Sequence, residues 1–211
     1  GLGDVYKRQH VEIYVHNSPY SAGLWDEIDR LGQEFRQTLT TETLKDISGI
    51  AATRQVYRAC GKDPSRYRPA AEALIRRILQ GKQLYQINTL VDLVNLASIR
   101  YGYSIGGFDA DKFEGDTLTL GVGRAGEPYE GIGRGTINIE GLPVYRDAVG
   151  GVGTPTSDHE RTKIDDNTTH LVVLINGYDG CEADVRANAE YILQLASDYC
   201  DGTDGSYYIY K

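Results

Sequence analysis

The stretch GKDPSRYRPAAEALIRRILQG, residues 61–81, carries five basic residues against two acidic ones, in a chain whose formal net charge is −8. Pro64 and Pro69 predict a rigid, extended approach, since proline fixes its own backbone and restricts the residue before it. After Pro69 the apolar residues recur at helical spacing as far as Gly81, which predicts a helix over 69–81. Two interpretations of the basic residues stay open: a phosphate-binding element, or a helix with a solvated basic face.

The chain as a whole is acidic but has the composition of a soluble globular protein. Its 211 residues are 40% hydrophobic and 25% charged, which suits one domain with a substantial core. Residues 1–105 hold 14 basic and 11 acidic residues, whereas residues 106–211 hold 8 and 19. A field of this overall sign repels nucleic acid, although a local basic face can still bind phosphates.

Three further features of the sequence are its first nine residues, its apolar runs and its cysteines. Residues 1–9 show no apolar periodicity, and we predict that they are non-native or disordered, leaving one domain over 10–211. No apolar run approaches the roughly 18 residues that span a bilayer, so no membrane partner is expected. The three cysteines, Cys60, Cys181 and Cys200, lack disulfide or zinc spacing, which predicts no metal, no cofactor and a cytoplasmic location.

Hydrophobic patterning predicts a mixed α+β domain, because most helical segments precede the strands. Helices are expected over 23–35, 49–60, 69–81, 87–102 and 181–200. Strands are expected over 10–16, 116–123, 135–141, 142–147, 169–177 and, at a sheet edge, 206–211.

The helix predicted over 87–102 places two polar residues beside its apolar face. Thr89 and Asp92 have the spacing of a capping box. Asp92 and Asn95 are three residues apart and so share a face, where they either satisfy nearby backbone groups or line a pocket.

A GxGxxG pattern at Gly121, Gly123 and Gly126 follows an alternating strand. A dinucleotide fingerprint requires a helix to begin there, so that its first amides face a pyrophosphate. Proline and three further glycines follow instead, so we interpret this pattern as a hairpin turn.

Reactive side chains are concentrated in PTSDHERTKI, residues 155–164. Neighbouring residues of an extended chain point to opposite sides, so these side chains cannot form a triad among themselves. Asp158 or His159 could act as a base with distant partners, and Arg161 could clamp a carboxylate or a phosphate. The alternative is a polar loop with an Asp-anchored turn.

Taken in order, GKDPSRYRPAAEALIRRILQG, INTLVDLVN, GGFDADKFEGDTLTLGVGRAGEPYEG and LPVYRD resemble the editing domain of the phenylalanyl-tRNA synthetase beta chain. The resemblance covers about residues 50–175 and is closer to freestanding relatives of that domain. It implies an α+β fold with a β-sandwich-like core. It also implies a pocket that admits tyrosine wrongly esterified to the tRNA for phenylalanine and hydrolyses the ester, with no cofactor.

The resemblance also implies site residues. Asn95 and the pair Gly150 and Gly151 match pocket positions of the family. Three family positions differ: Val94 replaces a threonine, Gly106 a histidine, and an apolar residue near Leu174 a glutamate. The freestanding relatives carry a segment that Asp158, Glu160, Arg161 and Thr162 match.

Two functional hypotheses from different classes follow. In the first, the domain binds tRNA or aminoacyl-tRNA and, if it is an enzyme, hydrolyses mischarged esters in the service of translation fidelity. Its candidate residues are catalytic (Asp158, His159, Arg161), pocket-lining (Asp92, Asn95, Gly150, Gly151, Thr162) and phosphate-binding (Arg66, Arg68, Arg76, Arg77). In the second, the domain binds an amino acid or metabolite and has lost tRNA. A weaker third hypothesis is an interaction domain without pocket chemistry.

Overall fold

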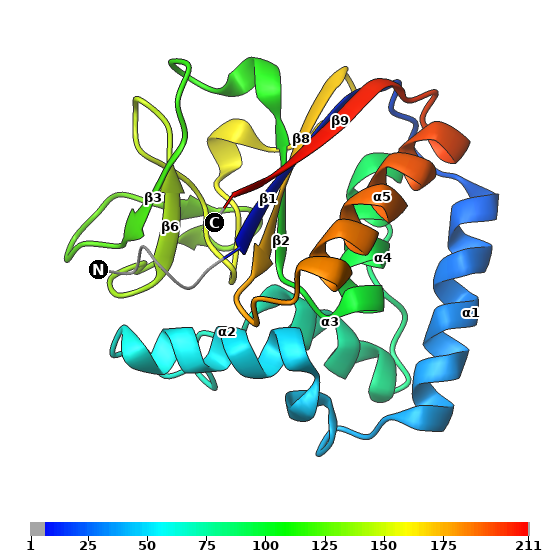
Figure 1. Cartoon of the computed structure of the whole chain (residues 1–211), viewed down its shortest axis with the longest axis horizontal. Coiled ribbons are helices and arrows are strands. Elements are labelled where there is room, and N and C mark those ends of the chain that lie inside the picture. Colours follow the sequence, from blue (N-terminus) through cyan, green and yellow to red (C-terminus); the bar gives the residue numbers. More distant parts are fainter. Residues whose placement is uncertain (1–6, 211) are drawn as a thin grey trace.

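The computed structural model describes residues 7–210, and the side chains from His10 onward (Figure 1). The helices of this part are α1 (Ala22–Thr38), α2 (Ser48–Ala59), α3 (Ala70–Leu79), α4 (Thr89–Tyr101) and α5 (Glu182–Tyr199). Its strands are β1 (Lys7–Tyr14), β2 (Ile105–Asp109), β3 (Thr119–Val122), β4 (Glu130–Gly131), β5 (Gly135–Thr136), β6 (Pro143–Arg146), β7 (Gly151–Gly153), β8 (His170–Gly177) and β9 (Thr203–Tyr210).

The main sheet has four strands in the order β2-β8-β1-β9, and every neighbouring pair is antiparallel. Its central strand β8 is buried almost along its whole length. Because side chains alternate between the two faces of a strand, Leu171 and Val173 pack on one side, whereas Val172 and Leu174 pack on the other. A continuous apolar run is therefore what this doubly covered strand requires.

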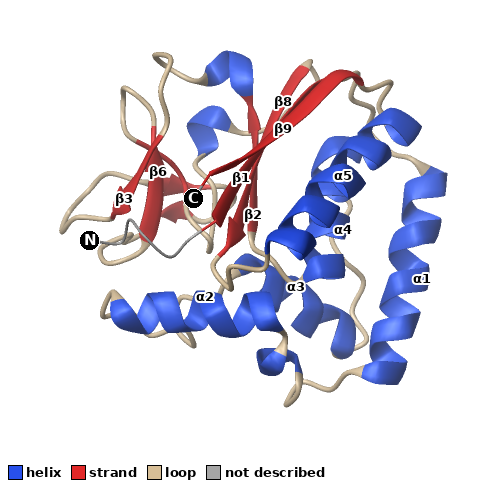
Figure 2. Cartoon of the chain, in the orientation of Figure 1, coloured by secondary structure: helices blue, strands red, loops and turns tan. Residues whose placement is uncertain are grey.

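Helices α4 and α5 pack on one face of the main sheet, α1 and α3 pack on these two helices, and α2 runs below both sheets (Figure 2). The apolar stripes of the four helices meet the sheet residues in one large core. The largest fully buried side chains of that core include Leu24, Ile50, Ile75, Leu93, Leu96 and Ile99.

The other face of the main sheet packs against a small sheet of order β3-β6-β7. Phe108 and Leu174 from the main sheet meet Tyr145 and Val152 from the small one. The structure thus confirms the α+β class with antiparallel sheets, and these side chains form its sandwich-like part.

Several boundaries differ from the sequence predictions. β1 begins at Lys7, so residues 7–9 of the excluded N-terminal segment pair with β8; residues 1–6 lie outside the described residues. Of the strand predicted over 135–141, only the two residues of β5 form. The cap of α4 is Asn88, whose side chain accepts a hydrogen bond from Val91 N, and not Thr89.

The GxGxxG pattern differs in part from its prediction. A turn forms at residues 124–127 and no helix follows it in the described chain, but the turn closes no hairpin, because β3 pairs with β6 and Gly123 bonds to Gly141 and Leu142. All three cysteines are free, and burial raises the pKa of the Cys200 thiol to about 12. Within residues 7–210, no helix has both the length and the apolar character that crossing a membrane requires.

Candidate functional site

The 153–162 loop joins β7 to a short 3₁₀ turn, Glu160–Thr162, and lies where the two sheets meet. It folds back on the small strands through two isolated bridges, Gly153 with Asp158 and Gly131 with His159. The amide of Ile132 donates to the carbonyl of Asp158 at 3.0 Å. These backbone bonds hold the reactive side chains of the loop on a rigid support.

The same loop is bonded to the basic stretch 61–81. The hydroxyl of Thr156 donates to the carbonyl of Tyr67 at 2.9 Å, and the amide of Ala70 donates to the carbonyl of Pro155 at 2.8 Å. Tyr57 of α2 adds a bond between its hydroxyl and that of Thr156, at 2.7 Å. Two segments that the sequence analysis singled out, about 90 residues apart, therefore form one unit.

The carboxyl group of Asp158 sits in a cradle of glycines. One of its oxygens accepts a hydrogen bond from the amide of Gly107 at 3.3 Å. The other would lie 3.2 Å from a Cβ at Gly106 and 2.9 Å from a Cβ at Gly153, so a side chain at either glycine would press on it. Both added Cβ atoms would also come within 2.6 Å of the Phe108 ring. Only glycine at 106 and 153 leaves room for this arrangement.

The buried position of the Asp158 carboxyl group raises its pKa. Burial of its carboxyl group raises the pKa to about 8, and the single bond from the Gly107 amide opposes that shift only in part. The residue keeps partial solvent exposure overall, so protons can reach it. At neutral pH most of the carboxyl groups are protonated, and the working range of this acid lies close to physiological pH.

His159 has a defined tautomer. Its Nδ1 accepts a hydrogen bond from the backbone amide of Arg161 at 2.9 Å, so Nδ1 carries no proton. Burial lowers the pKa of the ring, and the Arg161 guanidinium lowers it further, which keeps the ring neutral. The proton is therefore on Nε2, which can donate but cannot act as a base. The ring also packs edge-on against Tyr129, with 4.9 Å between centroids.

Arg161 is bound within the protein. Its two terminal nitrogens each lie 2.8 Å from an oxygen of Asp147, a carboxylate that is 1% exposed. Asp147 also accepts the amide of Gly150 at 3.1 Å, and these donors hold its pKa well below the usual range. The predicted anion clamp therefore already holds a carboxylate, in the bidentate geometry that guanidinium favours.

The remaining predicted pocket residues of this region lie close by. Gly151 of β7 lies against Tyr129, whose ring carbons would be 2.9 Å from an added Cβ. Thr162 is fully buried, and its hydroxyl is one of the buried groups without a hydrogen-bond partner among the described residues. The structure thus brings Asp158, His159, Arg161, Thr162, Gly150 and Gly151 into one neighbourhood.

Asp92 of α4 lies away from this loop. Asp92 is 1% exposed and accepts hydrogen bonds from Trp25 Nε1 and from the amide of Ile87, both at 3.1 Å. Burial raises its pKa. Its side chain faces α1 and the segment before α4. Asn95 is half-buried, one residue beyond Val94 on the same helix.

Three arginines surround one buried carboxylate on the basic stretch. Glu72 is 1% exposed, and both its oxygens accept from Arg54, at 3.0 and 2.9 Å. Arg76 reaches the same carboxylate at 3.4 Å, and Arg68 approaches it at 3.7 Å. The Nε atoms of Arg68 and Arg76 are buried without a hydrogen-bond partner in the described structure. One negative charge thus faces three positive ones.

The other two arginines of the stretch point to different surfaces. Arg66 is exposed, lies over the Tyr67 ring, and lines a hollow of about 620 Å³. Arg77 donates to the carbonyl of Gln83 at 2.5 Å and stacks over Tyr85 at 3.9 Å. The basic residues therefore do not form one uniform face.

Sequence reasoning missed the groups that the fold supplies from a distance. Asp147 and Arg54 were not singled out, although Asp147 binds the predicted Arg161 and Arg54 shares Glu72 with the predicted Arg68 and Arg76. No local pattern marks them, since their contacts join positions 14 and 18 residues apart. Among residues 7–210, no group of three or more His, Cys, Asp or Glu side chains could hold a metal ion.

Comparison with known protein families identifies the family of this chain. Residues 52–199, well over half of the chain, match the B3/4 domain family. The chain belongs to the B3/4 domain family. This confirms the resemblance to a synthetase beta-chain domain that the motifs from Arg66 onward suggested.

This B3/4 domain also has a match among solved structures. The N-terminal fragment of the phenylalanyl-tRNA synthetase beta-subunit from Pyrococcus horikoshii is 12% identical, with a TM-score of 0.45. The match covers 94% of the chain described here and 46% of the Pyrococcus horikoshii fragment. The chain described here therefore spans about half the length of that fragment. A search of curated proteins found no match.

The B3/4 domain has a physical reason for glycine at 106, where the resemblance places a histidine in the synthetase. The Phe108 ring and the Asp158 carboxyl fill the space that a side chain at 106 would enter. The Asp158 carboxyl group and the Phe108 ring therefore leave no room for a side chain at residue 106.

Proposed function

We propose that this B3/4 domain binds the aminoacyl end of a tRNA beside the 153–162 loop and hydrolyses the aminoacyl ester there. The observation that carries the proposal is the Asp158 carboxyl group, held between two sheets with a pKa of about 8. A general base works best when its pKa lies near the working pH, and burial supplies that shift here.

Asp158 would act in its ionised form. It takes a proton from a water molecule, and the oxygen of that water bonds to the carbonyl carbon of the ester. The bond from this carbon to the ribose oxygen then breaks, and the proton passes from Asp158 to the ribose oxygen. The products are a free amino acid and a tRNA with a free terminal hydroxyl.

The neighbours of Asp158 would have supporting roles. His159 offers a hydrogen-bond donor at Nε2, because its Nδ1 is occupied by the Arg161 amide. Arg161, bound to Asp147, holds the 3₁₀ turn against the turn between β6 and β7 and is a positioning residue. Gly150, Gly151, Thr162 and Asn95 remain proposed pocket residues. Asp92 is not one of them, because its buried carboxyl group faces Trp25 and the Ile87 amide.

The arginines around Glu72 support tRNA binding. Three guanidinium groups and one carboxylate leave two excess positive charges beside the segment that is bonded to the loop. A backbone phosphate near this cluster would meet the side chains of Arg68 and Arg76, which are 41% and 27% exposed. Arg66 and Arg77 would contact the tRNA at its flanks.

The decisive experiment is deacylation of the tRNA for phenylalanine carrying tyrosine, together with other mischarged tRNAs. Wild-type protein should hydrolyse at least one of them, and Asp158→Asn should lower the rate by about 10²-fold or more. Asp166→Asn, a change at an exposed aspartate close to the same loop, should leave the rate unchanged. Equal rates for wild-type and Asp158→Asn would remove Asp158 from the chemistry.

Binding is measured separately, by titrating uncharged tRNA at several salt concentrations. Arg68→Ala should weaken binding and reduce the salt slope by about 1, whereas Arg30→Ala on α1 should not. If no tRNA binds or is deacylated, while an amino acid or metabolite raises the melting temperature, the domain is a small-molecule-binding module instead.

A further inference from the structure

Strand β9 forms one edge of the main sheet, with β1 on its inner side (Figure 1). Tyr207 pairs with Val11 of β1, and Tyr208 pairs with His10. Among residues 7–210, the backbone of Ser206–Tyr210 has no hydrogen-bond partner other than β1. The N–H and C=O groups of alternate residues therefore point away from the sheet, where they form a template for another strand.

This edge lacks the features that usually protect an edge strand, which are lysine, proline or a bulge. β9 has a bulge only near its start, where the pairing register shifts around Asp204, a residue with a φ of 53°. The segment that follows, Ser206–Tyr210, pairs regularly with β1 and contains neither lysine nor proline. It also carries no charged side chain, in a chain whose net charge is −8. A regular and uncharged edge of about 17 Å is thus left open.

Contacts on the helix side hold β9 in place. Tyr207 shares a face with its partner Val11, which belongs to the large core. The Tyr207 hydroxyl accepts a hydrogen bond from Arg186 at 3.1 Å and donates one to Glu190 at 2.8 Å, both on α5. Because these contacts already order the strand, pairing with it costs little conformational entropy.

The opposite face of β9 carries exposed aromatic side chains. Tyr208 is 58% exposed and Tyr210 is 53% exposed. The His10 ring lies beside Tyr208, with 6.2 Å between the ring centroids. Tyrosine is enriched at protein interfaces, because its ring is apolar and its hydroxyl still finds a polar partner. The open edge therefore has side chains suited to an interface beside its free backbone groups.

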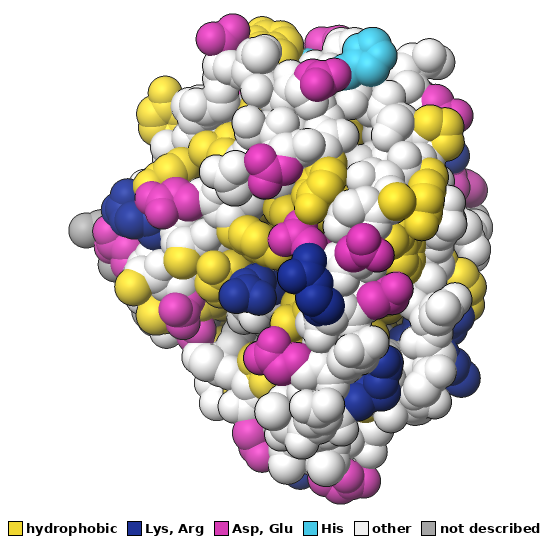
Figure 3. All heavy atoms as spheres, turned by 90° about the vertical axis from the view of Figure 1, so that its right-hand side faces the viewer, with side chains coloured by type: hydrophobic (Ala, Val, Ile, Leu, Met, Phe, Trp, Pro, Cys, Tyr) yellow, Lys and Arg dark blue, Asp and Glu magenta, His cyan; other side chains and the backbone are white. Residues whose placement is uncertain are grey.

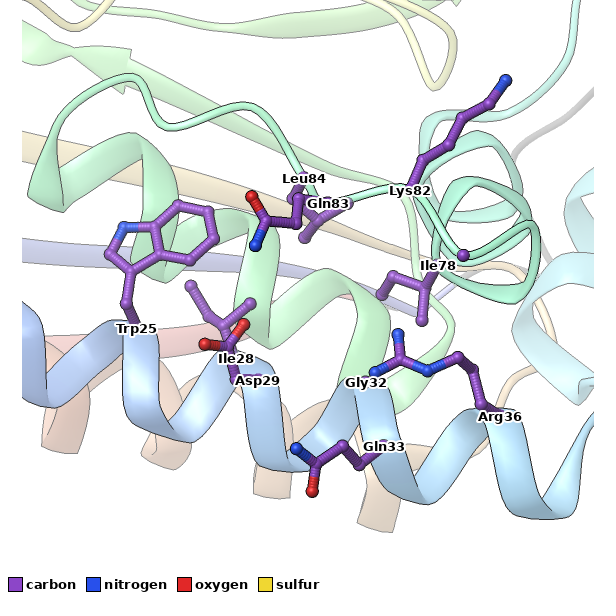
Figure 4. Close-up of a pocket in the computed structure, with 11 residues that line it drawn as sticks. Trp25, Ile28, Asp29, Gly32, Gln33, Arg36, Ile78, Lys82, Gln83 and Leu84 are labelled. Carbon is purple, nitrogen blue, oxygen red and sulfur yellow. The ribbon is translucent and has the colours of Figure 1, made fainter.

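The α1 side of the molecule has no comparable feature. Acidic, basic and hydrophobic side chains are interspersed over that face (Figure 3). The hollow of about 390 Å³ between α1 and the segment after α3 has an almost fully buried apolar floor, formed by Ile28 and Ile78 (Figure 4). Its charged residues Asp29 and Arg36 are exposed to solvent. Neither the face nor the hollow selects a partner, whereas the β9 edge selects another strand.

We propose that the β9 edge pairs with β9 of a second copy of this chain, antiparallel and centred on Tyr208. In this register Tyr208 faces Tyr208 of the second copy, Tyr207 faces Ile209 of the second copy, and Ser206 faces Tyr210 of the second copy. Every pair is uncharged, so two acidic chains meet without like charges opposite each other. The contact stays within the regular segment and leaves both bulges outside it. A two-fold axis pairs both free edges at once and closes the assembly.

The area of this contact indicates a weak dimer. A fully covered tyrosine buries about 150–250 Å², so the exposed halves of Tyr208 and Tyr210 in two copies supply roughly 400 Å². With the paired backbone added, the interface still lies at the low end of specific interfaces, below about 1,200 Å². We expect a dissociation constant on the order of 10⁻⁵ M. The combined sheet ends in β2 on both sides, and Asp158 lies beside β2, so the dimer contact is remote from the proposed site of hydrolysis.

Sedimentation equilibrium of the whole chain, from about 1 to 500 μM, measures the association. Wild-type protein should change from monomer to dimer across this range. Tyr208→Glu places two negative charges at the symmetry axis and should raise the dissociation constant by at least about tenfold. Tyr20→Glu adds the same charge at a tyrosine that is 50% exposed and precedes α1, so it is the matched control and should associate as wild type. Both tyrosines are exposed, and circular dichroism should show that both variants are folded.

A charge-pair experiment tests the register. Tyr208→Lys alone should also weaken association, whereas an equimolar mixture of Tyr208→Glu and Tyr208→Lys should associate more tightly than either variant alone, because unlike charges then meet at the axis. Wild-type protein that stays monomeric up to the highest concentration would overturn the proposal. So would a Tyr208→Glu variant that associates as wild type, or a mixture that associates no better than its components. None of these outcomes involves tRNA, so the deacylation hypothesis stands or falls separately.

Discussion

Arg161 donates to both carboxylate oxygens of Asp147 at 2.8 Å, across the junction between the 3₁₀ turn and the small sheet. Asp147 is 1% exposed, whereas the Arg161 side chain is 28% exposed. The pair therefore consists of a buried anion and a cation that closes it off from solvent. The first prediction concerns the loss of this ion pair.

Arg161→Met should destabilise the domain by about 2–4 kcal/mol at pH 7, because it leaves a buried carboxylate without its cation. Urea unfolding measures this. The pKa of Asp147 is depressed in the folded state, so the contribution exists above about pH 4 and is lost as the pH falls further. The double variant with Asp147→Asn should recover part of the loss, and an additive loss would contradict the pairing.

Gly106→Ala should destabilise the domain by about 2 kcal/mol, because its Cβ would lie 2.6 Å from the Phe108 ring. Phe108→Leu in the same chain should relieve the clash and make the added cost of Gly106→Ala smaller. Gly150→Ala is the matched control: nothing lies within 4 Å of its added Cβ. We expect a change of no more than about 0.5 kcal/mol there by chemical denaturation.

Asp158→Asn should change how stability depends on pH. The folded-state pKa of about 8 exceeds the unfolded value of about 3.9, so the folded state holds this proton more tightly. Wild-type stability therefore falls as the pH rises from about 4 through 8, and the variant should lack this part of the fall. Melting temperatures of both proteins between pH 5 and 9 provide the comparison; parallel curves would contradict a raised pKa.

The rate of ester hydrolysis should depend on the same ionisation of Asp158. Stability falls as the pH rises, whereas this rate should rise. If Asp158 is the base, the enzymatic rate rises with pH and levels off above about 8, after subtraction of the uncatalysed reaction. A rate that falls with pH across this range would show that the protonated form acts, as an acid.

Glu72→Gln should destabilise the domain by about 3 kcal/mol, since Arg54, Arg68 and Arg76 would lose their shared carboxylate. An anion that enters the cluster can replace the lost charge. Phosphate should therefore raise the melting temperature of this variant more than it raises that of wild type, at equal ionic strength. Glu114→Gln, a change at an exposed glutamate, should show no such difference.

The helices and three of the four main-sheet strands were predictable because their signals are local, whereas β2, which contains Gly106 and Gly107, was missed. In α3 and α5 the apolar residues repeat at helical spacing, and β8 is a continuous apolar run that only a covered strand tolerates. The glycine-rich region around β5 was predicted with less success, because its pairing depends on the neighbouring loop and not on its own residues. The cap of α4 was assigned to Thr89 because capping-box spacing alone does not distinguish it from Asn88.

The candidate site was predictable in its residue types but not in its geometry. The sequence pointed to Asp158 as a reactive group, yet its raised pKa comes from burial between the two sheets, where Gly106 and Gly153 leave room for the carboxyl group. Likewise, Arg161 was predicted to clamp an anion, and the anion is Asp147 from the preceding strand region. Asp92 was expected either to satisfy nearby backbone groups or to line a pocket, and it accepts hydrogen bonds from the Ile87 amide and Trp25 Nε1, as the first alternative describes.

The position of Asp158 between β2 and β7 links proton binding to the spacing of the two sheets. If the gap widens enough to admit water, the carboxyl group is hydrated, its pKa falls toward the ordinary value and a proton is released. By thermodynamic reciprocity, ionisation favours the wider gap by the same free energy with which the narrow gap retains the proton. The protonation state of Asp158 therefore depends on the distance between the main sheet and the small sheet.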